Sequence, residues 1–138
     1  AAAVAGAFYD AGFRAGTIIA RNEAAGTALA RRYGYTWASE PGDLTAPVIV
    51  NVTPIGMSGG AESEQLAYPQ PTIEAASVVF DVVAMPVETP LIRAARAAGR
   101  EVITGGEVIA LQAAEQFRLY TGVTLSPDDI AQAEAQAN

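Results

Sequence analysis

The chain has 138 residues, a net charge of −7 at neutral pH and a hydrophobic fraction of 51%, which fits one domain with a substantial core. Its acidic character argues against binding to nucleic acid or to an anionic membrane surface, and no apolar run approaches the ~20 residues that span a bilayer. Histidine, cysteine and lysine do not occur, which excludes Cys/His metal sites, Ser-His-Asp triads, cysteine nucleophiles and lysine Schiff bases within this chain.

The first third of the sequence predicts an alternation of helices and strands. The expected elements are a helix over residues 1–11, a short β-branched strand over 16–20, a helix over 24–33 and a short strand over 35–37. Asn22 is suited to cap the second helix and Gly34 to end it. Because the sequence opens inside a helical pattern and without a methionine, we expect it to be a piece of a longer protein.

Residues 48–52 form the most apolar strand candidate, and Thr53, Pro54 and Gly56 stop it. A continuous apolar run ended by turn residues is typical of a strand buried on both faces, as in a parallel sheet. The loop after such a strand lies at the edge where open α/β sheets bind ligands. An ordinary buried strand with a turn after it is the alternative.

The rest of the chain continues the alternation. The expected elements are an exposed loop over 58–71, a buried strand over 76–83, a helix over 90–98, a strand over 101–103 and helices over 105–120 and 127–136. Strands alternating with helices imply an α/β fold with a mostly parallel sheet.

Four residues are candidate site residues on the basis of their type and position alone. Arg21 follows the first strand, where a guanidinium favours a cofactor with a 2′-phosphate, although a solvated arginine is the alternative. Asp81 interrupts an apolar strand and needs partners, either in loop amides or in a site. Gly105 at a helix start allows close approach of a ligand or makes a plain tight turn. Gln112 lies on one helix face, where an amide is usually just solvated.

Three motifs in order resemble those of the shikimate dehydrogenase family. The stretch N-V-T-P-I-G-M over 51–57 is similar to the family signature N-x-T-P-x-G-M. The segment V-F-D-V-V over 79–83, followed by T-P-L over 89–91, and the segment from Gly105 through Q-A-A-E-Q-F at 112–117 resemble two further family segments. The likeness runs from about residue 1 to 122 and is nearest to the shikimate dehydrogenase-like branch.

The resemblance implies a Rossmann-like three-layer domain and a set of site residues. Arg21 would meet the 2′-phosphate of NADP, and Gln112 would hydrogen-bond substrate hydroxyls. The residues expected to line the cofactor cleft are Asn51, Thr53, Met57, Val82, Val83 and Gly105. No metal is implied. The family reduces 3-dehydroshikimate to shikimate with NADPH, in the pathway to chorismate and the aromatic amino acids.

The resemblance also predicts what this chain would lack. The first strand, the glycine-rich loop and the substrate domain with its catalytic Lys–Asp pair are expected outside it, so the chain alone is expected to be inactive. Residues 1–122 would form the NADP-binding domain, and 123–138 a helix that packs on the substrate domain. We expect a small-molecule substrate, a cytoplasmic location and, as one possible assembly, a homodimer. The alternative is a non-catalytic dinucleotide-binding or regulatory module with the same fold.

Overall fold

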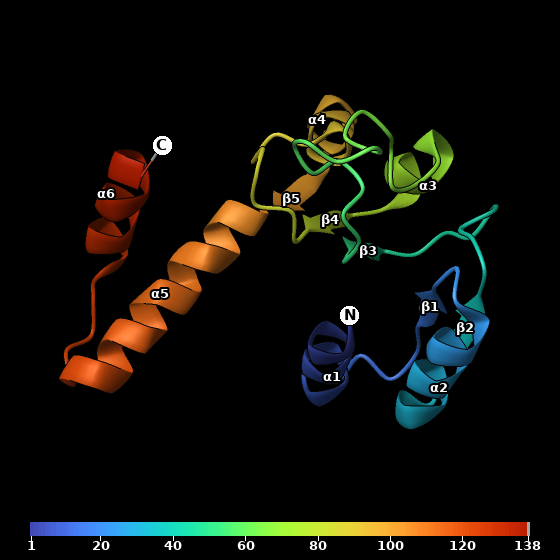
Figure 1. Ribbon diagram of the computed structural model, residues 1–138, viewed down its shortest axis with the longest axis horizontal. Helices are drawn as coiled ribbons and strands as arrows, with labels where there is room; N and C mark the ends of the chain where they lie inside the picture. Colours follow the sequence, from blue (N-terminus) through green and yellow to red (C-terminus); the bar gives the residue numbers. More distant parts are fainter. Residues whose placement is uncertain (138) are drawn as a thin grey trace. The chain divides into compact units, whose positions relative to one another are not determined.

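The computed structural model describes residues 1–137, which divide into two compact units, Ala1–Leu44 and Thr45–Asn138. Each unit contains its own parallel sheet (Figure 1). Among the described residues, no helix is long and apolar enough to cross a membrane. The division that the sequence predicts at residue 122 stays a prediction.

The first unit is a small α/β layer. Its elements in chain order are α1 (Ala2–Asp10), β1 (Thr17–Ile19), α2 (Glu23–Tyr33) and β2 (Thr36–Ala38). The two strands pair in parallel, with Thr17 opposite Thr36. Helix α2 packs on both strands. All four elements were expected from the sequence, within one or two residues at each end.

Local side chains fix the two ends of α2. The Asn22 side chain accepts a hydrogen bond from the Ala25 amide, and Gly34 ends the helix in the left-handed conformation at a φ of 71°. An acceptor at the N-cap and a glycine after the last turn satisfy backbone groups that the helix cannot pair internally. Both predicted boundary signals are therefore confirmed.

The second unit is built on a three-stranded parallel sheet in the order β3-β4-β5. Its elements are β3 (Val48–Asn51), α3 (Gln70–Ala75), β4 (Val78–Asp81), α4 (Pro90–Ala97), β5 (Glu101–Ile103), α5 (Gly105–Thr121) and α6 (Pro127–Ala137). Helix α4 packs on β4 and β5 with α3 beside it, and α6 packs along α5 (Figure 1). Helix α3 was not predicted, because its first residues lie in a stretch that reads as a Pro-rich loop.

The core of this unit lies between the sheet and the two short helices. Its buried members are Ile49, Ile73, Ala76, Val79, Leu91 and Ala95. Along β3 burial alternates: Ile49 and Asn51 are buried, whereas Val48 and Val50 are only half-buried. Of the burial predicted for both faces, one face is therefore confirmed, and the side chains on the other are only half-buried. Helices α3 and α4 cover one face of the sheet, so alternate side chains differ in burial.

Reciprocal caps start the last two helices. Thr104 accepts a hydrogen bond from the Glu107 amide, and the Glu107 carboxylate accepts from the Thr104 amide. Ser126 and Asp129 make the same exchange at the start of α6. This capping box satisfies two orphan amides at once.

Tyr68 joins the loop before α3 to the sheet. Its hydroxyl donates a 2.7 Å hydrogen bond to the Val50 carbonyl. Burial, with a smaller effect from the charge of Asp81, raises the pKa of Tyr68 to about 12. The phenol therefore stays protonated and keeps donating this bond across the whole neutral and moderately alkaline range.

We predict that Tyr68→Phe lowers the free energy of unfolding by about 1 kcal/mol, the net value of one hydrogen bond whose acceptor loses its partner. Urea denaturation measures the change. The matched control is Tyr120→Phe, because Tyr120 is 89% exposed and its hydroxyl should matter by less than about 0.5 kcal/mol. Equal effects of the two substitutions would contradict the role given to Tyr68.

Candidate functional site

The candidate site is built on the carboxyl ends of β3 and β4. The parallel register places Asn51 directly opposite Asp81, each as the last residue of its strand. Their side chains are almost completely buried, with exposures of 2% and 0%. Two polar side chains side by side in the interior must satisfy one another or nearby backbone groups, because an unpaired buried polar atom is costly.

The Asn51 side chain organises the loop that follows β3. Its Nδ2 group donates to the Ile55 carbonyl at 3.1 Å and to Asp81 Oδ1 at 3.0 Å. Its Oδ1 atom accepts from the Thr53 amide at 3.0 Å and from the Thr53 hydroxyl at 2.6 Å. The carboxamide has two donor hydrogens and two acceptor lone pairs. All four positions are therefore used within the protein.

Asp81 does the same for the loop that follows β4. Its Oδ1 atom accepts from Asn51 and also from the Val83 amide at 3.0 Å. Its Oδ2 atom accepts from the Thr89 hydroxyl at 2.7 Å. One carboxylate thus ties the end of β4 to both flanking loops. Of the two roles that the sequence left open for Asp81, the bonds to loop amides and hydroxyls are those present.

Burial sets the charge balance of this carboxylate. Desolvation raises the pKa of Asp81 above its ordinary value, while the hydrogen bonds from Thr89, Val83 and Asn51 oppose the rise because they stabilise the ionised form. The carboxylate receives three hydrogen bonds and no cation among the described contacts, so its stabilisation comes from neutral donors.

Thr89 completes the network from the start of α4. Its hydroxyl donates to Asp81 and accepts from the Ile92 amide, so it also serves as the N-cap of α4. The sequence analysis used Thr89 only as part of a family motif. Threonine immediately before a proline at the first helical position is an N-cap signal that could have identified it. We call Asn51, Thr53, Asp81 and Thr89 the strand-end network.

Gly56 allows the loop after β3 to lie against the start of α4. Its φ of 86° favours glycine, and a Cβ there would lie 3.2 Å from the Thr89 Cβ and 3.3 Å from the Pro90 Cδ. A further link joins the loops, because the Ser58 amide donates to the Met85 carbonyl at 2.9 Å. The two loops therefore pack as one surface.

Gly105 brings the start of α5 against the loop after β4. A Cβ on Gly105 would lie 2.4 Å from the Val83 carbonyl oxygen and 2.7 Å from that of Val82. Only a residue without a side chain permits this approach. The structure thus joins Gly105 to Val82 and Val83, which the resemblance had grouped with it. The space that a Cβ on Gly105 would need is occupied by the Val82 and Val83 carbonyl groups.

The remaining predicted residues of this unit differ in exposure. Met57 is 43% exposed, Thr53 and Val82 are half-buried, and Val83 is buried. Gln112 is exposed on α5, seven residues after Gly105. At about 100° per residue this spacing returns Gln112 to nearly the same helix face as Gly105, roughly 10 Å further along. The structure therefore groups five predicted residues closely and places Met57 and Gln112 at the surface.

Arg21 belongs to the other unit. It is exposed and follows β1 directly, before the Asn22 cap.

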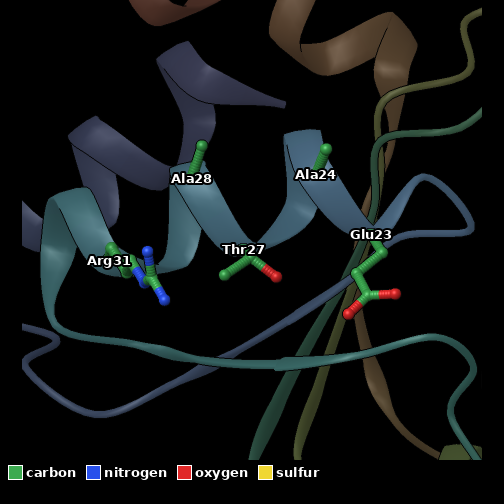
Figure 2. A pocket seen from close by; sticks show the side chains of 5 residues that line it. All are labelled: Glu23, Ala24, Thr27, Ala28 and Arg31. Carbon is green, nitrogen blue, oxygen red and sulfur yellow. The ribbon is translucent and has the colours of Figure 1, made fainter.

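A separate shallow hollow lies on α2 in that unit, lined by Glu23, Ala24, Thr27, Ala28 and Arg31 (Figure 2). Its lining comes from one helix and Arg21 is not part of it, so we assign no ligand to it.

The chemistry open to the strand-end network is limited. Its only ionisable group is the buried Asp81, which already accepts three hydrogen bonds. Within residues 1–137 no group of His, Cys, Asp and Glu could hold a metal ion. Such an arrangement can shape and orient a bound molecule, but it offers no solvent-facing acid or base to move a proton.

No protein-family model matches the chain. The chain is 51% identical over 137 residues to a shikimate dehydrogenase-like protein of Haemophilus influenzae. The aligned region covers 99% of this chain and 51% of that relative. The chain thus spans about half the length of the curated relative. The resemblance drawn from the three motifs is confirmed.

Solved structures agree with the Rossmann-like fold that the resemblance implied. A shikimate 5-dehydrogenase-like protein superposes with a TM-score of 0.93 at 51% identity, over 96% of this chain and 49% of its own. Shikimate 5-dehydrogenase of Thermus thermophilus, solved with NADP(H) and shikimate, superposes with a TM-score of 0.82 at 29% identity. The match covers 99% of this chain and 51% of that one. Quinate dehydrogenase of Corynebacterium glutamicum, solved with NAD, superposes with a TM-score of 0.80 at 27% identity. The match covers 97% of this chain and 49% of that one.

We predict that Gly105→Ala lowers the free energy of unfolding by about 2–3 kcal/mol, because the added methyl group meets two backbone carbonyls that cannot move independently. The control is Gly106→Ala, whose Cβ would meet two side chains and no backbone: Val87 at 3.3 Å and the Thr104 hydroxyl at 3.8 Å. That change should matter by less than about 1 kcal/mol, since alanine is the better helix former. Urea denaturation separates the two, and a harmless Gly105→Ala would refute the close approach.

We predict that ionisation of Asp81 makes the free energy of unfolding depend on pH. Because its folded-state pKa is raised, the folded protein holds this proton more strongly than the unfolded chain does. Its contribution to the unfolding free energy is therefore full below the ordinary value of 3.8 and is lost as pH rises through the raised pKa. The stability of the parent protein minus that of Asp81→Asn, from denaturation at a series of pH values, should fall with rising pH. A difference that grows with pH would contradict this assignment.

Proposed function

The chain is a relative of one half of the shikimate dehydrogenase-like proteins, and from this premise we propose that it is the carboxyl-terminal, cofactor-binding part of an NADP-dependent dehydrogenase. The reaction of the whole protein would be the reduction of 3-dehydroshikimate to shikimate by NADPH, or the equivalent reaction of a related polyol acid such as quinate. The observation that carries the proposal is the strand-end network, which residues of the N-x-T-P-x-G-M segment build together with Asp81 and Thr89 at the ligand-binding edge of an α/β sheet.

The residues on the surface of this edge suit a dinucleotide. Thr53, Met57 and Val82 offer a mainly apolar surface beside the strand ends, on which a nicotinamide ring can lie. Arg21 supplies a permanently charged guanidinium after β1, and such a group pairs well with phosphate oxygens. Gln112 would hydrogen-bond substrate hydroxyls from α5. The family resemblance gives Thr53, Met57 and Val82 a place in the cofactor cleft. It gives Arg21, in the other unit, the 2′-phosphate and Gln112 the substrate hydroxyls.

The choice of NADP over NAD rests on Arg21. One related solved enzyme carries NADP(H) and another carries NAD, so membership of the wider group does not decide the cofactor. In dinucleotide folds an acidic residue after the second strand of the motif binds a free 2′-hydroxyl, whereas an arginine there accommodates a 2′-phosphate. This chain has A-R-N at 20–22, which supports the phosphate.

The cofactor would supply the hydride chemistry, and the residues of this chain would supply binding and orientation. That division of labour is usual for cofactor enzymes. Since the strand-end network has no free acid or base, we place the proton-transferring groups outside this chain. The homodimer, the cytoplasmic location and the packing of residues 123–138 on a substrate domain stay predictions.

A non-catalytic dinucleotide-binding module is the second candidate. It is favoured by one observation, the lack of a solvent-facing acid or base in the strand-end network. Turnover separates the two functions: the protein expressed from its complete gene should oxidise shikimate or quinate with NADP. Binding of NADP without any turnover on a panel of polyol acids would favour the module.

We predict that Arg21→Ala in that protein raises the Kd for NADPH by about 10- to 100-fold, as expected for the loss of a charge-assisted pair of 1.5–3 kcal/mol. The Kd for NADH should change little, because NADH has no 2′-phosphate. Arg32→Ala serves as the control, since Arg32 lies at the other end of α2 and stacks on Tyr33. Calorimetry with both cofactors measures the four affinities, and equal losses for NADPH and NADH would rule out the phosphate assignment.

A further inference from the structure

The strand-end network joins two loops that are distant in sequence. Residues 52–57 follow β3 and residues 82–89 follow β4, and each loop is bonded to the last residue of its own strand. The Asn51–Asp81 hydrogen bond is the link between the two halves. A shift of either loop would therefore break bonds made by the other.

Asn51 has no hydrogen-bonding capacity to spare for a ligand, and the buried Asp81 keeps only one of its about four lone-pair sites. Asn51 uses two donors and two acceptors internally, and Asp81 accepts three bonds. Both are almost fully buried. A ligand that reached either side chain would have to displace partners whose desolvated groups would be left unpaired, which is unfavourable.

We infer that Asn51 and Asp81 are positioning residues, which hold the loops 52–57 and 82–89 in one arrangement and do not touch the bound dinucleotide. The inference rests on the proposed function for the identity of the ligand, and it replaces direct contact by Asn51, expected from the family resemblance, with an indirect role. Contact falls instead to the exposed and half-buried residues of the same loops, Thr53, Met57 and Val82.

The chemical identity of the pair fits this role. The two side chains face each other across the ladder, so two carboxylates would repel each other. With two carboxamides, an amide nitrogen would take the place of Asp81 Oδ2, and the Thr89 hydroxyl would lose its acceptor. One amide and one carboxylate satisfy every donor of the network. Thr89 extends this arrangement to α4, because the same hydroxyl holds Asp81 and caps the helix.

Thr89 provides the test, because it is buried with 0% exposure and so acts on a ligand only through its partners in the protein, Asp81 first among them. Thr89→Val keeps the shape and removes the hydroxyl, while Thr89→Ser keeps the hydroxyl. In the protein expressed from its complete gene, Thr89→Val should raise the amide exchange rates of Val83 and Thr53 by about tenfold. It should weaken NADPH binding by about tenfold, and Thr89→Ser should stay within about threefold of the parent on both measures.

A second pair of variants keeps the inference testable if the Thr89→Val protein does not fold. Thr53→Val and Thr53→Ser change the other loop, and amide exchange at Val83, across the network, should rise about tenfold in the valine variant alone. Unchanged exchange at the far loop in both valine variants would overturn the inference. If exchange responds as expected but the parent protein binds no NADPH, the positioning of the loops stands and the proposed function falls.

Direct contact is tested by nuclear magnetic resonance with NADPH itself. On binding, the Met57 methyl signal should shift, whereas the Asn51 side-chain amide signals should remain protected and show no nuclear Overhauser contact with the nicotinamide protons. Such a contact from Asn51 would overturn the inference. Its absence, together with the response of the Thr89 variants, would establish a role exerted through the loops.

Discussion

The hydrogen bond between Asn51 and Asp81 is the constraint on which the rest of the second unit depends. It lies inside the parallel pairing of β3 and β4 and is shielded from water. In such surroundings a polar group must find protein partners, and a partly satisfied network is worse than an apolar one. The loops after both strands supply those partners, so satisfying two buried side chains also determines the path of two loops.

This arrangement explains why the sheet edge is well formed although it has little regular structure. The loop after β3 is held by Asn51, by the positive φ of Gly56 and by the Ser58–Met85 backbone bond. The loop after β4 is held by Asp81, Thr89 and the close approach of Gly105. A site that must orient a flexible cofactor benefits from such preorganisation, because less order has to be imposed on binding.

The motif positions and every helix except α3 were predictable from sequence for local reasons. Asn22, Gly34, Pro90 and Gly122 act within one helical turn of their own position, and the structure has helix boundaries next to each of them. The three motifs also led to the family, a resemblance that is confirmed over nearly the whole chain. Burial was harder to predict. The apolar run at 48–52 suggested two covered faces, but which faces are covered depends on helices that arrive later in the chain.

The sequence by itself determined the order of the strands and of every helix except α3, the resemblance to the shikimate dehydrogenases, and the absence of histidine, cysteine and lysine chemistry from this chain. Those properties depend on residue type and short-range spacing. Only the tertiary structure decided that Asn51, Asp81 and Thr89 form one closed set of hydrogen bonds, and that Gly105 rests on the Val82 and Val83 carbonyls. The physical reason is that parallel pairing brings residues 30 positions apart into register, and nothing in the spacing along the chain states which buried donors will meet which acceptors.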